Sequence, residues 1–251
     1  MKDNPNISVV LTAWNRPQYL EEQVEAVLSQ TIRPHEVVLW YNQPSKKLGI
    51  LPRKQLVNFK HSNRVKKIIC DYNFGIIPRF ALSSCLDGDY ICIFDDDTIP
   101  GRRWFENCMR FVESERCLLG TIGLRYLSLD QGSVKTETPR MGWEAQNENL
   151  EFVDLVGHSW FFKKRWMQYF WLEEPLLKTF GEDIHFCSML AKHGIRCACP
   201  PHSASDKSFW GSLHPERGVD SVAISVSKDR SKDYFNVVRH EISKGYKPIL
   251  L

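Results

Sequence analysis

The first hundred residues alternate short apolar runs with segments whose apolar positions recur at helical spacing. Continuous apolar runs of about four to eight residues are typical of buried strands, whereas spacings of three and four are typical of amphipathic helices. Strands and helices in alternation favour an α/β domain with a mainly parallel central sheet that is flanked by helices. The expected strands are residues 7–11, 36–40, 64–70 and 90–94, and the expected helices are residues 17–28 with Asn15 as cap, 76–86 and 101–114.

Beyond residue 114 the alternation becomes less regular. The pattern predicts strands at residues 117–126, 152–162 and 195–199, and helices at residues 182–193 and 229–244. The polar stretch 130–149 is too long for a simple turn, and loops of such length are usually functional or disordered. We expect one domain over residues 1–203 and a C-terminal tail or lid over residues 204–251, which does not form an independent domain.

The composition narrows the class of protein. Of the 251 residues, 43% are apolar and 25% are charged, which is typical of a globular protein with a sizeable core. The chain has no apolar run long enough to span a bilayer, and its first residues lack the apolar stretch of a signal peptide, so we expect a cytoplasmic protein without a transmembrane segment. The net charge of +3 is small and the basic residues are scattered, so a nucleic-acid polymer is not an expected partner.

The eight cysteines lie mostly within apolar segments, which favours reduced and buried thiols over a disulfide framework. Cys197, Cys199 and His202 would supply part of a zinc site. Because no second cysteine pair completes a tetrahedral set, we do not expect zinc.

Three consecutive carboxylates, Asp95, Asp96 and Asp97, follow the apolar run of residues 90–94. Such charge at the end of a buried strand is costly unless a cation or a donor-rich ligand neutralises it. Oxygen ligands suit Mg²⁺ or Mn²⁺, which commonly share their coordination with substrate phosphates. The triplet therefore predicts a metal site for a nucleotide diphosphate.

Polar segments also follow the other three expected strands, at residues 12–16, 41–43 and 71–75. In an open parallel sheet, ligands bind beyond the carboxyl ends of the strands, near the point where the strand order reverses. We therefore expect these segments and the acid triplet to line one ligand site.

With these motifs the chain resembles the nucleotide-sugar-dependent glycosyltransferases of the GT-A fold, most closely the inverting family 2. Residues 8–20 look like the opening strand, Asn-Arg-Pro turn and first helix of that family, and residues 28–31 look like the end of that helix. Residues 73–75, with Arg79 after them, are similar to its Asn-x-Gly segment. The acid triplet matches its Asp-x-Asp metal motif, and Glu182-Asp183 matches the Glu-Asp motif that supplies the catalytic base. The resemblance covers about residues 6–203 and implies a single Rossmann-like GT-A domain with a C-terminal extension.

The resemblance also implies roles for individual residues. Asp97, Asp95 and His202 would bind Mn²⁺ or Mg²⁺, with His214 as the second candidate histidine, and Asp183 would be the catalytic base. Glu182 would bind a glycan or glycoconjugate acceptor together with Trp160, which we place at a strand end bordering the cleft. The donor, foremost a UDP-sugar, would be bound by ten residues: Thr12, Ala13, Asn15, Arg16, Tyr41, Asn42, Asn73, Arg79, Asp95 and Asp96.

Two segments depart from the family pattern. Aspartates commonly end the second strand in the family, whereas residues 40–43 read Trp-Tyr-Asn-Gln here. The family's arginine after Glu-Asp is also missing, because residues 185–187 read His-Phe-Cys, which indicates a specialised acceptor region.

Two other functions remain open. A sugar nucleotidyltransferase shares much of this architecture, although residues 12–16 lack the glycine-rich phosphate loop that is typical of such an enzyme. A non-catalytic module that binds glycans or nucleotides is the other alternative, although an idle site would gain nothing from retaining buried acids.

Overall fold

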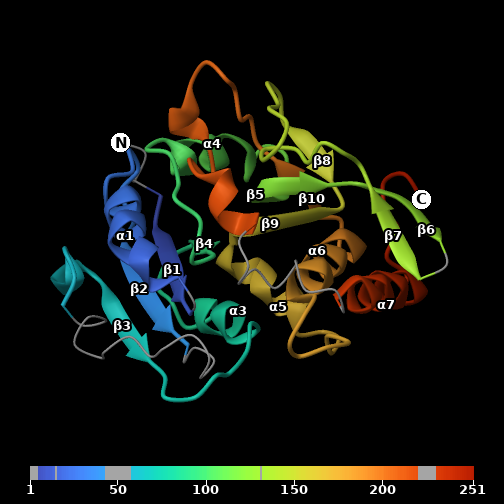
Figure 1. The fold of residues 1–251 in the computed structure, drawn as a ribbon, viewed down its shortest axis with the longest axis horizontal. Coiled ribbons are helices and arrows are strands. Elements are labelled where there is room, and N and C mark those ends of the chain that lie inside the picture. The colour runs from blue at the N-terminus through green and yellow to red at the C-terminus, as the bar shows by residue number, and fades with distance from the viewer. Residues whose placement is uncertain (1–4, 15, 43–57, 131, 220–229) are drawn as a thin grey trace.

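The computed structural model describes residues 5–14, 16–42, 58–130, 132–219 and 230–251. Its centre is one large sheet with the strand order β3-β2-β1-β4-β9-β5-β10-β8 (Figure 1). Six of these strands run in the same direction, whereas β9 and β8 are antiparallel to their neighbours. The strands are β1 (Ile7–Ala13), β2 (Glu36–Tyr41), β3 (Lys66–Ile69), β4 (Tyr90–Phe94), β5 (Cys117–Leu124), β8 (Glu151–Val153), β9 (Leu155–Lys163) and β10 (Arg196–Cys199).

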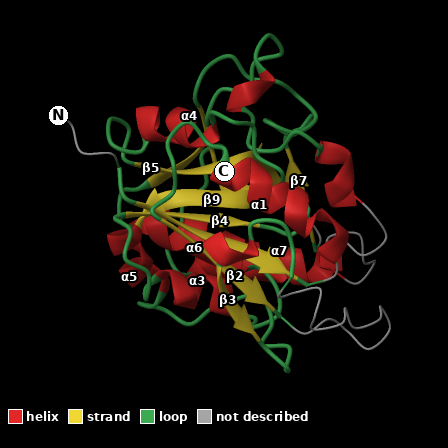
Figure 2. Cartoon of the chain, turned by 90° about the vertical axis from the view of Figure 1, so that its left-hand side faces the viewer, coloured by secondary structure: helices red, strands yellow, loops and turns green. Residues whose placement is uncertain are grey.

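Helices cover both faces of the sheet, as Figure 2 shows from the side. Successive residues of a strand point to opposite faces, and the aromatic residues of β9 show which helices lie on each. Trp160 and Phe162 pack against aromatic rings of α3 and α6, whereas Phe161 packs against a ring of α4. The helices are α1 (Leu20–Leu28), α3 (Pro78–Ser83), α4 (Trp104–Phe111), α5 (Met167–Phe170), α6 (Glu182–Lys192) and α7 (Arg230–Ser243).

The expected α/β fold with a mainly parallel sheet is confirmed, and the strand order reverses between β1 and β4. From β1 the chain moves outward through β2 and β3, then returns to place β4 on the other side of β1. The carboxyl ends of β1 and β4 therefore lie side by side, which is where ligands bind in open sheets of this kind.

The second half differs from the sequence expectation at two strands. The expected strand 117–126 ends at Leu124, and the polar stretch that follows contains a separate hairpin of β6 (Tyr126–Asp130) and β7 (Ser133–Thr136). The expected strand 152–162 is divided into β8 and β9, which pair with different neighbours. Asp154 lies at the division, and its buried carboxylate accepts hydrogen bonds from the backbone N–H of Tyr126 and Ile249 and from the Tyr246 hydroxyl.

The C-terminal helix α7 packs on α6 and on β7, as Figure 1 shows at the right of the molecule. In the part of the chain that the structure describes, no helix is both long and apolar enough to cross a membrane.

Candidate functional site

The acid turn that follows β4 is held from two neighbouring elements. The backbone N–H of Asp95 and the Thr98 hydroxyl donate to the carbonyl oxygen of His158 in β9, at 3.0 and 3.1 Å. From α1, the buried Gln23 amide donates to the carbonyl oxygens of Asp95 and Thr98, at 2.6 and 2.8 Å. These bonds satisfy the backbone of the turn internally, so the aspartate side chains remain to form the site.

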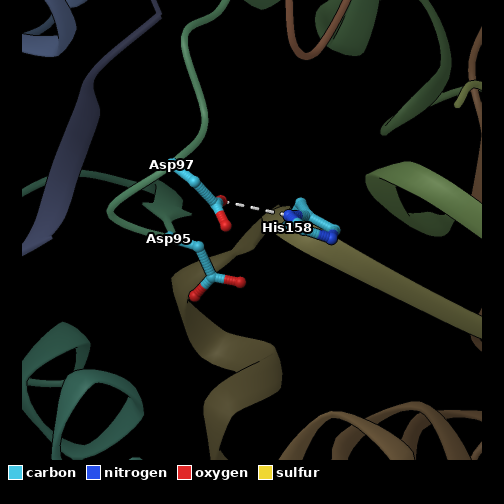
Figure 3. Close-up of side chains that lie close together, drawn as sticks. All are labelled: Asp95, Asp97 and His158. Atoms are coloured by element: carbon cyan, nitrogen blue, oxygen red, sulfur yellow. Dashed lines mark hydrogen bonds and ion pairs between the residues drawn. The ribbon is translucent and has the colours of Figure 1, made fainter. Parts of the chain in front are cut away.

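Asp95, Asp97 and His158 form the one group of three or more acidic, histidine or cysteine side chains, among the described residues, whose arrangement suits a metal ion. Each offers a ligand atom, and these atoms all lie within 4.8 Å of one another. Figure 3 shows both carboxylates and the imidazole ring converging, with His158 Nδ1 at 3.1 Å from Asp97 Oδ1. Two carboxylates and one imidazole are a donor set that fits a divalent metal ion.

Asp97 and His158 each shift the pKa of the other toward its charged form. Burial would raise the pKa of Asp97, but the hydrogen bond and charge of His158 and the charge of Arg16 lower that pKa to about 2. Burial would lower the pKa of His158, but the hydrogen bond and charge of Asp97 raise that pKa above its ordinary value. The hydrogen bond with His158 and the charge of Arg16 therefore favour the ionised Asp97 carboxylate.

His158 itself is tightly constrained. Its φ of +62° is rare for a residue other than glycine, and its ring stacks on Trp143 with a centroid distance of 4.1 Å. On another side lies Gly218, where a Cβ atom would approach His158 Cε1 to 2.6 Å. An uncommon backbone conformation and contacts from two distant segments thus hold the imidazole toward the aspartates.

Arg16, an expected donor ligand, lies beside the acid turn. Its guanidinium is 2.8 Å from Asp96 Oδ1 and 3.3 Å from Asp97 Oδ2, and its backbone N–H donates to Asp96 Oδ2 at 3.2 Å. The middle aspartate of the triplet therefore interacts with the loop that follows β1.

Arg79 of α3 connects the acid turn to α6. Its guanidinium forms ion pairs with Asp95 and, at 2.5 Å, with Glu182, and it stacks on the Trp160 ring at 4.6 Å. Asp95 and Glu182 are 87 positions apart in the sequence, and both pair with this one buried arginine. The two acidic motifs therefore meet at Arg79. Glu182 is 5% exposed, and in this structure its carboxylate is engaged by Arg79 rather than presented to an acceptor.

Asp183 is the next residue of the same helical turn. Burial and the charge of Glu182 raise the pKa of the Asp183 carboxyl to about 7. One of its oxygens accepts a hydrogen bond from the Ile184 backbone N–H at 2.8 Å. A carboxylate whose pKa is near neutrality is well suited to accept a proton at physiological pH.

His202 does not lie at the metal position that we expected for it. Its Nδ1 is 2.7 Å from the Pro200 carbonyl oxygen, and its Nε2 accepts the Gly211 N–H at 3.0 Å, so both ring nitrogens are used within the protein. The second candidate, His214, forms ion pairs with Glu22 and Glu216 instead. Neither histidine belongs to the group formed by Asp95, Asp97 and His158.

Trp160 also lies differently from the expectation. Its side chain is 1% exposed, and its indole N–H donates to the Val156 carbonyl oxygen at 3.1 Å. The Trp160 side chain therefore has little surface left for an acceptor, and the face of its ring packs against the Arg79 guanidinium instead.

Of the residues expected at the donor nucleotide, Thr12 and Ala13 end β1, Tyr41 ends β2, and Asn42 follows it. Thr12 donates from its hydroxyl to the Phe94 carbonyl oxygen, and the Ala13 carbonyl oxygen accepts the Asn42 N–H. Tyr41 is 3% exposed, with a buried hydroxyl that has no hydrogen-bond partner among the described residues. Asn15 lies outside the described residues.

Asn42 and Asn73 hold one turn together. The Asn42 amide donates to Asn73 Oδ1 at 2.8 Å and to the Gly75 carbonyl oxygen at 3.0 Å, and its own oxygen accepts the Phe74 N–H at 2.9 Å. Its polar atoms are thus committed to the 73–75 turn, on which the Phe74 ring is 54% exposed.

Three comparisons with known proteins bear on the family and the fold of this chain. A family model described as glycosyltransferase like family 2 matches residues 5–240. An uncharacterized glycosyltransferase of Haemophilus influenzae is 28% identical over 114 residues, which is 45% of this chain and 34% of that protein. An uncharacterized glycosyltransferase of Methanocaldococcus jannaschii is 26% identical over 119 residues, which is 45% of this chain and 39% of that protein. The matched segments thus span well under half the length of these relatives.

Among solved structures, the crystal structure of residues 1–349 of S. aureus TarS matches with a TM-score of 0.55. The match covers 79% of this chain and 59% of that chain at 14% identity. At this identity the match shows a shared fold, the GT-A type.

Proposed function

Because the chain belongs to the glycosyltransferase like family 2, we propose that it transfers a sugar from a nucleotide-sugar donor, foremost a UDP-sugar, to a hydroxyl of a glycan or glycoconjugate. The observation that carries this proposal is the meeting of two acidic motifs at Arg79. One motif has a donor set for a divalent cation, and the other carries Asp183, whose pKa of about 7 suits a base.

The cation would be held by Asp95, Asp97 and His158. The imidazole in this set favours Mn²⁺ over Mg²⁺, because Mg²⁺ prefers oxygen ligands alone. When bound, the metal would neutralise the charge that develops on the departing diphosphate. Because Arg16 and Arg79 contact the acid turn, both guanidinium groups are near enough to bind the phosphates of a donor held there.

Asp183 would act on the acceptor. In an inverting transfer, a base opposite the leaving group takes the acceptor hydroxyl proton as that oxygen attacks the anomeric carbon. The sugar carbon exchanges its bond to the diphosphate oxygen for a bond to the acceptor oxygen, and the proton passes to Asp183. Burial that raises the pKa of Asp183 also makes its ionised form a stronger base.

A thermal-shift screen of nucleotide sugars with Mn²⁺ tests donor binding, because a ligand that binds only the folded state raises the melting temperature. We expect a Mn²⁺-dependent shift with a UDP-sugar and loss of that shift in Asp97→Ala. A protein that instead forms pyrophosphate from a nucleoside triphosphate and a sugar phosphate would be a nucleotidyltransferase. A protein that binds the nucleotide sugar but never turns it over would be a binding module.

A further inference from the structure

His185 lies two residues after Asp183 in α6. The structure buries its ring to 1% exposure between α5 and α7. Nδ1 is 2.8 Å from Glu241 Oε1 of α7, and Nε2 is 3.0 Å from the Phe170 carbonyl oxygen of α5. Because both partners are acceptors, both ring nitrogens are placed to donate, and His185 joins α6 to two other helices.

Glu241 completes a buried charged network. Its carboxylate is 1% exposed, and its second oxygen lies 3.4 Å from Lys192 Nζ, which is also 3.1 Å from Glu173. Oε2 has no hydrogen-bond partner among the described residues, so the Glu241 carboxylate is held by the hydrogen bond with His185 and by the charge of Lys192. Removing one partner of a buried ion pair is costly, so these contacts hold α7 against α6.

A second contact brings α7 against the turn that carries the acids. Gly181 precedes Glu182 with a φ of +81°, and a Cβ atom placed there would lie 2.9 Å from Val237 Cγ1. One turn away, Tyr234 packs edge-to-face on Phe180 with a centroid distance of 6.4 Å. The side chains of α7 therefore contact Phe180 and Gly181 before the two acids and His185 after them.

We propose that Glu241 is a positioning residue that, through His185, fixes the rotation of α6 about its own axis and thereby aims the Asp183 carboxylate. Two residues along an α-helix are separated by about 200° around the axis, so His185 is anchored on the side roughly opposite Asp183. A carboxyl about 5 Å from the axis moves by roughly 1 Å when the helix turns by about 10°, and such a displacement can cost about 100-fold in rate.

This inference rests on the proposed function and assigns a role to α7, which the sequence analysis treated as part of a tail or lid. It also gives the buried His185 side chain a role in the contact with α7. The proposed donor-binding residues lie on elements other than α6 and α7, although Arg79 contacts α6 through Glu182. Loss of Glu241 should therefore affect turnover much more than donor binding.

The test compares Glu241→Gln with Asp233→Asn in the full chain. Both changes replace a carboxylate of α7 by an amide, but Asp233 pairs only with Arg230 of its own helix among the described residues. For Glu241→Gln we expect kcat for donor turnover with Mn²⁺ to fall about tenfold or more, with KM for the donor within about twofold of wild type. Asp233→Asn should keep both values. If Glu241→Gln does not fold, Val237→Ala removes the contact on Gly181 without changing a charge, and the same split is expected.

Hydrogen exchange of the amides of residues 185–188 supplies a readout that does not depend on activity. We expect exchange there to be about tenfold faster in Glu241→Gln and unchanged in Asp233→Asn. A wild-type protein without turnover would overturn the proposed function, and the exchange rates would still decide whether α7 holds α6. Unchanged kcat in an active Glu241→Gln protein, or unchanged exchange, would overturn the positioning role.

Discussion

At the scale of single residues, His158 shows how much of the site depends on tertiary structure. The family resemblance implied His202 as the metal-binding histidine, whereas the ring that meets the aspartates comes from β9. The antiparallel pairing of β9 with β4 sets Ser159 opposite Phe94 and so brings His158 to the acid turn. The residue spacing in the sequence does not predict this strand pairing, because β4 and β9 are some sixty residues apart.

We expect His158→Ala to weaken Mn²⁺ binding about tenfold or more, because it removes one of the three proposed protein ligands and a hydrogen-bond partner of Asp97. Calorimetric titration with Mn²⁺ measures this. The matched control is His214→Ala, which removes a partly exposed histidine outside the cluster and should leave the affinity unchanged. Equal affinities in wild type and His158→Ala would remove the histidine from the metal site.

The raised pKa of Asp183 predicts how the activity depends on pH. The base must be ionised to accept a proton, and burial together with Glu182 raises its pKa to about 7. We therefore expect kcat/KM to rise about tenfold per pH unit below about pH 7 and to level off above it. An ordinary aspartate would give no such rise above about pH 5.

The matched variant is Asp183→Asn, which should lose transfer and keep Mn²⁺-dependent donor binding, since the metal group lies on other elements. Full transfer activity in this variant would exclude Asp183 as the base.

At the scale of elements, the strands of the first half could be predicted because each is a continuous apolar run closed by polar residues. β4 matches the expected residues 90–94, and β1 and β2 extend beyond the expected ends by only one or two residues. The second half was harder, because the apolar run of residues 152–162 gives no sign that the chain changes partners at Asp154. What separates β8 from β9 is a set of hydrogen bonds to residues that are distant in sequence.

Asp154 therefore provides a prediction at this scale. In Asp154→Asn, one carboxylate oxygen becomes an amide that faces donors from Tyr126 or from Tyr246 and Ile249. We expect a loss of about 2 kcal/mol in the free energy of unfolding, measured by chemical denaturation. Asp130→Asn is the control, because that side chain is exposed and should change stability by less than about 0.5 kcal/mol. Equal stability of the two variants would mean that Asp154 does not fix the division between β8 and β9.

At the scale of the whole molecule, the site is built where the sheet reverses its strand order. Polar segments at the carboxyl ends of β1, β2 and β4 were identified from the sequence, because the rule for open parallel sheets depends only on strand direction. The link from the acid turn to α6 through Arg79 could not be identified in that way. It requires α3 and α6 to lie on the same face of the sheet, which is settled by aromatic packing among Phe80, Phe186 and Trp160.

The most direct test of this account is the release of nucleoside diphosphate from nucleotide sugars by the purified chain, with Mn²⁺ and with a chelator. We expect release from at least one donor, UDP-sugars foremost, with loss of activity by about 100-fold or more on chelation or in Asp97→Ala. Release that is unaffected by the chelator, or by the Asp97 substitution, would contradict a metal-dependent transferase site at the end of β4.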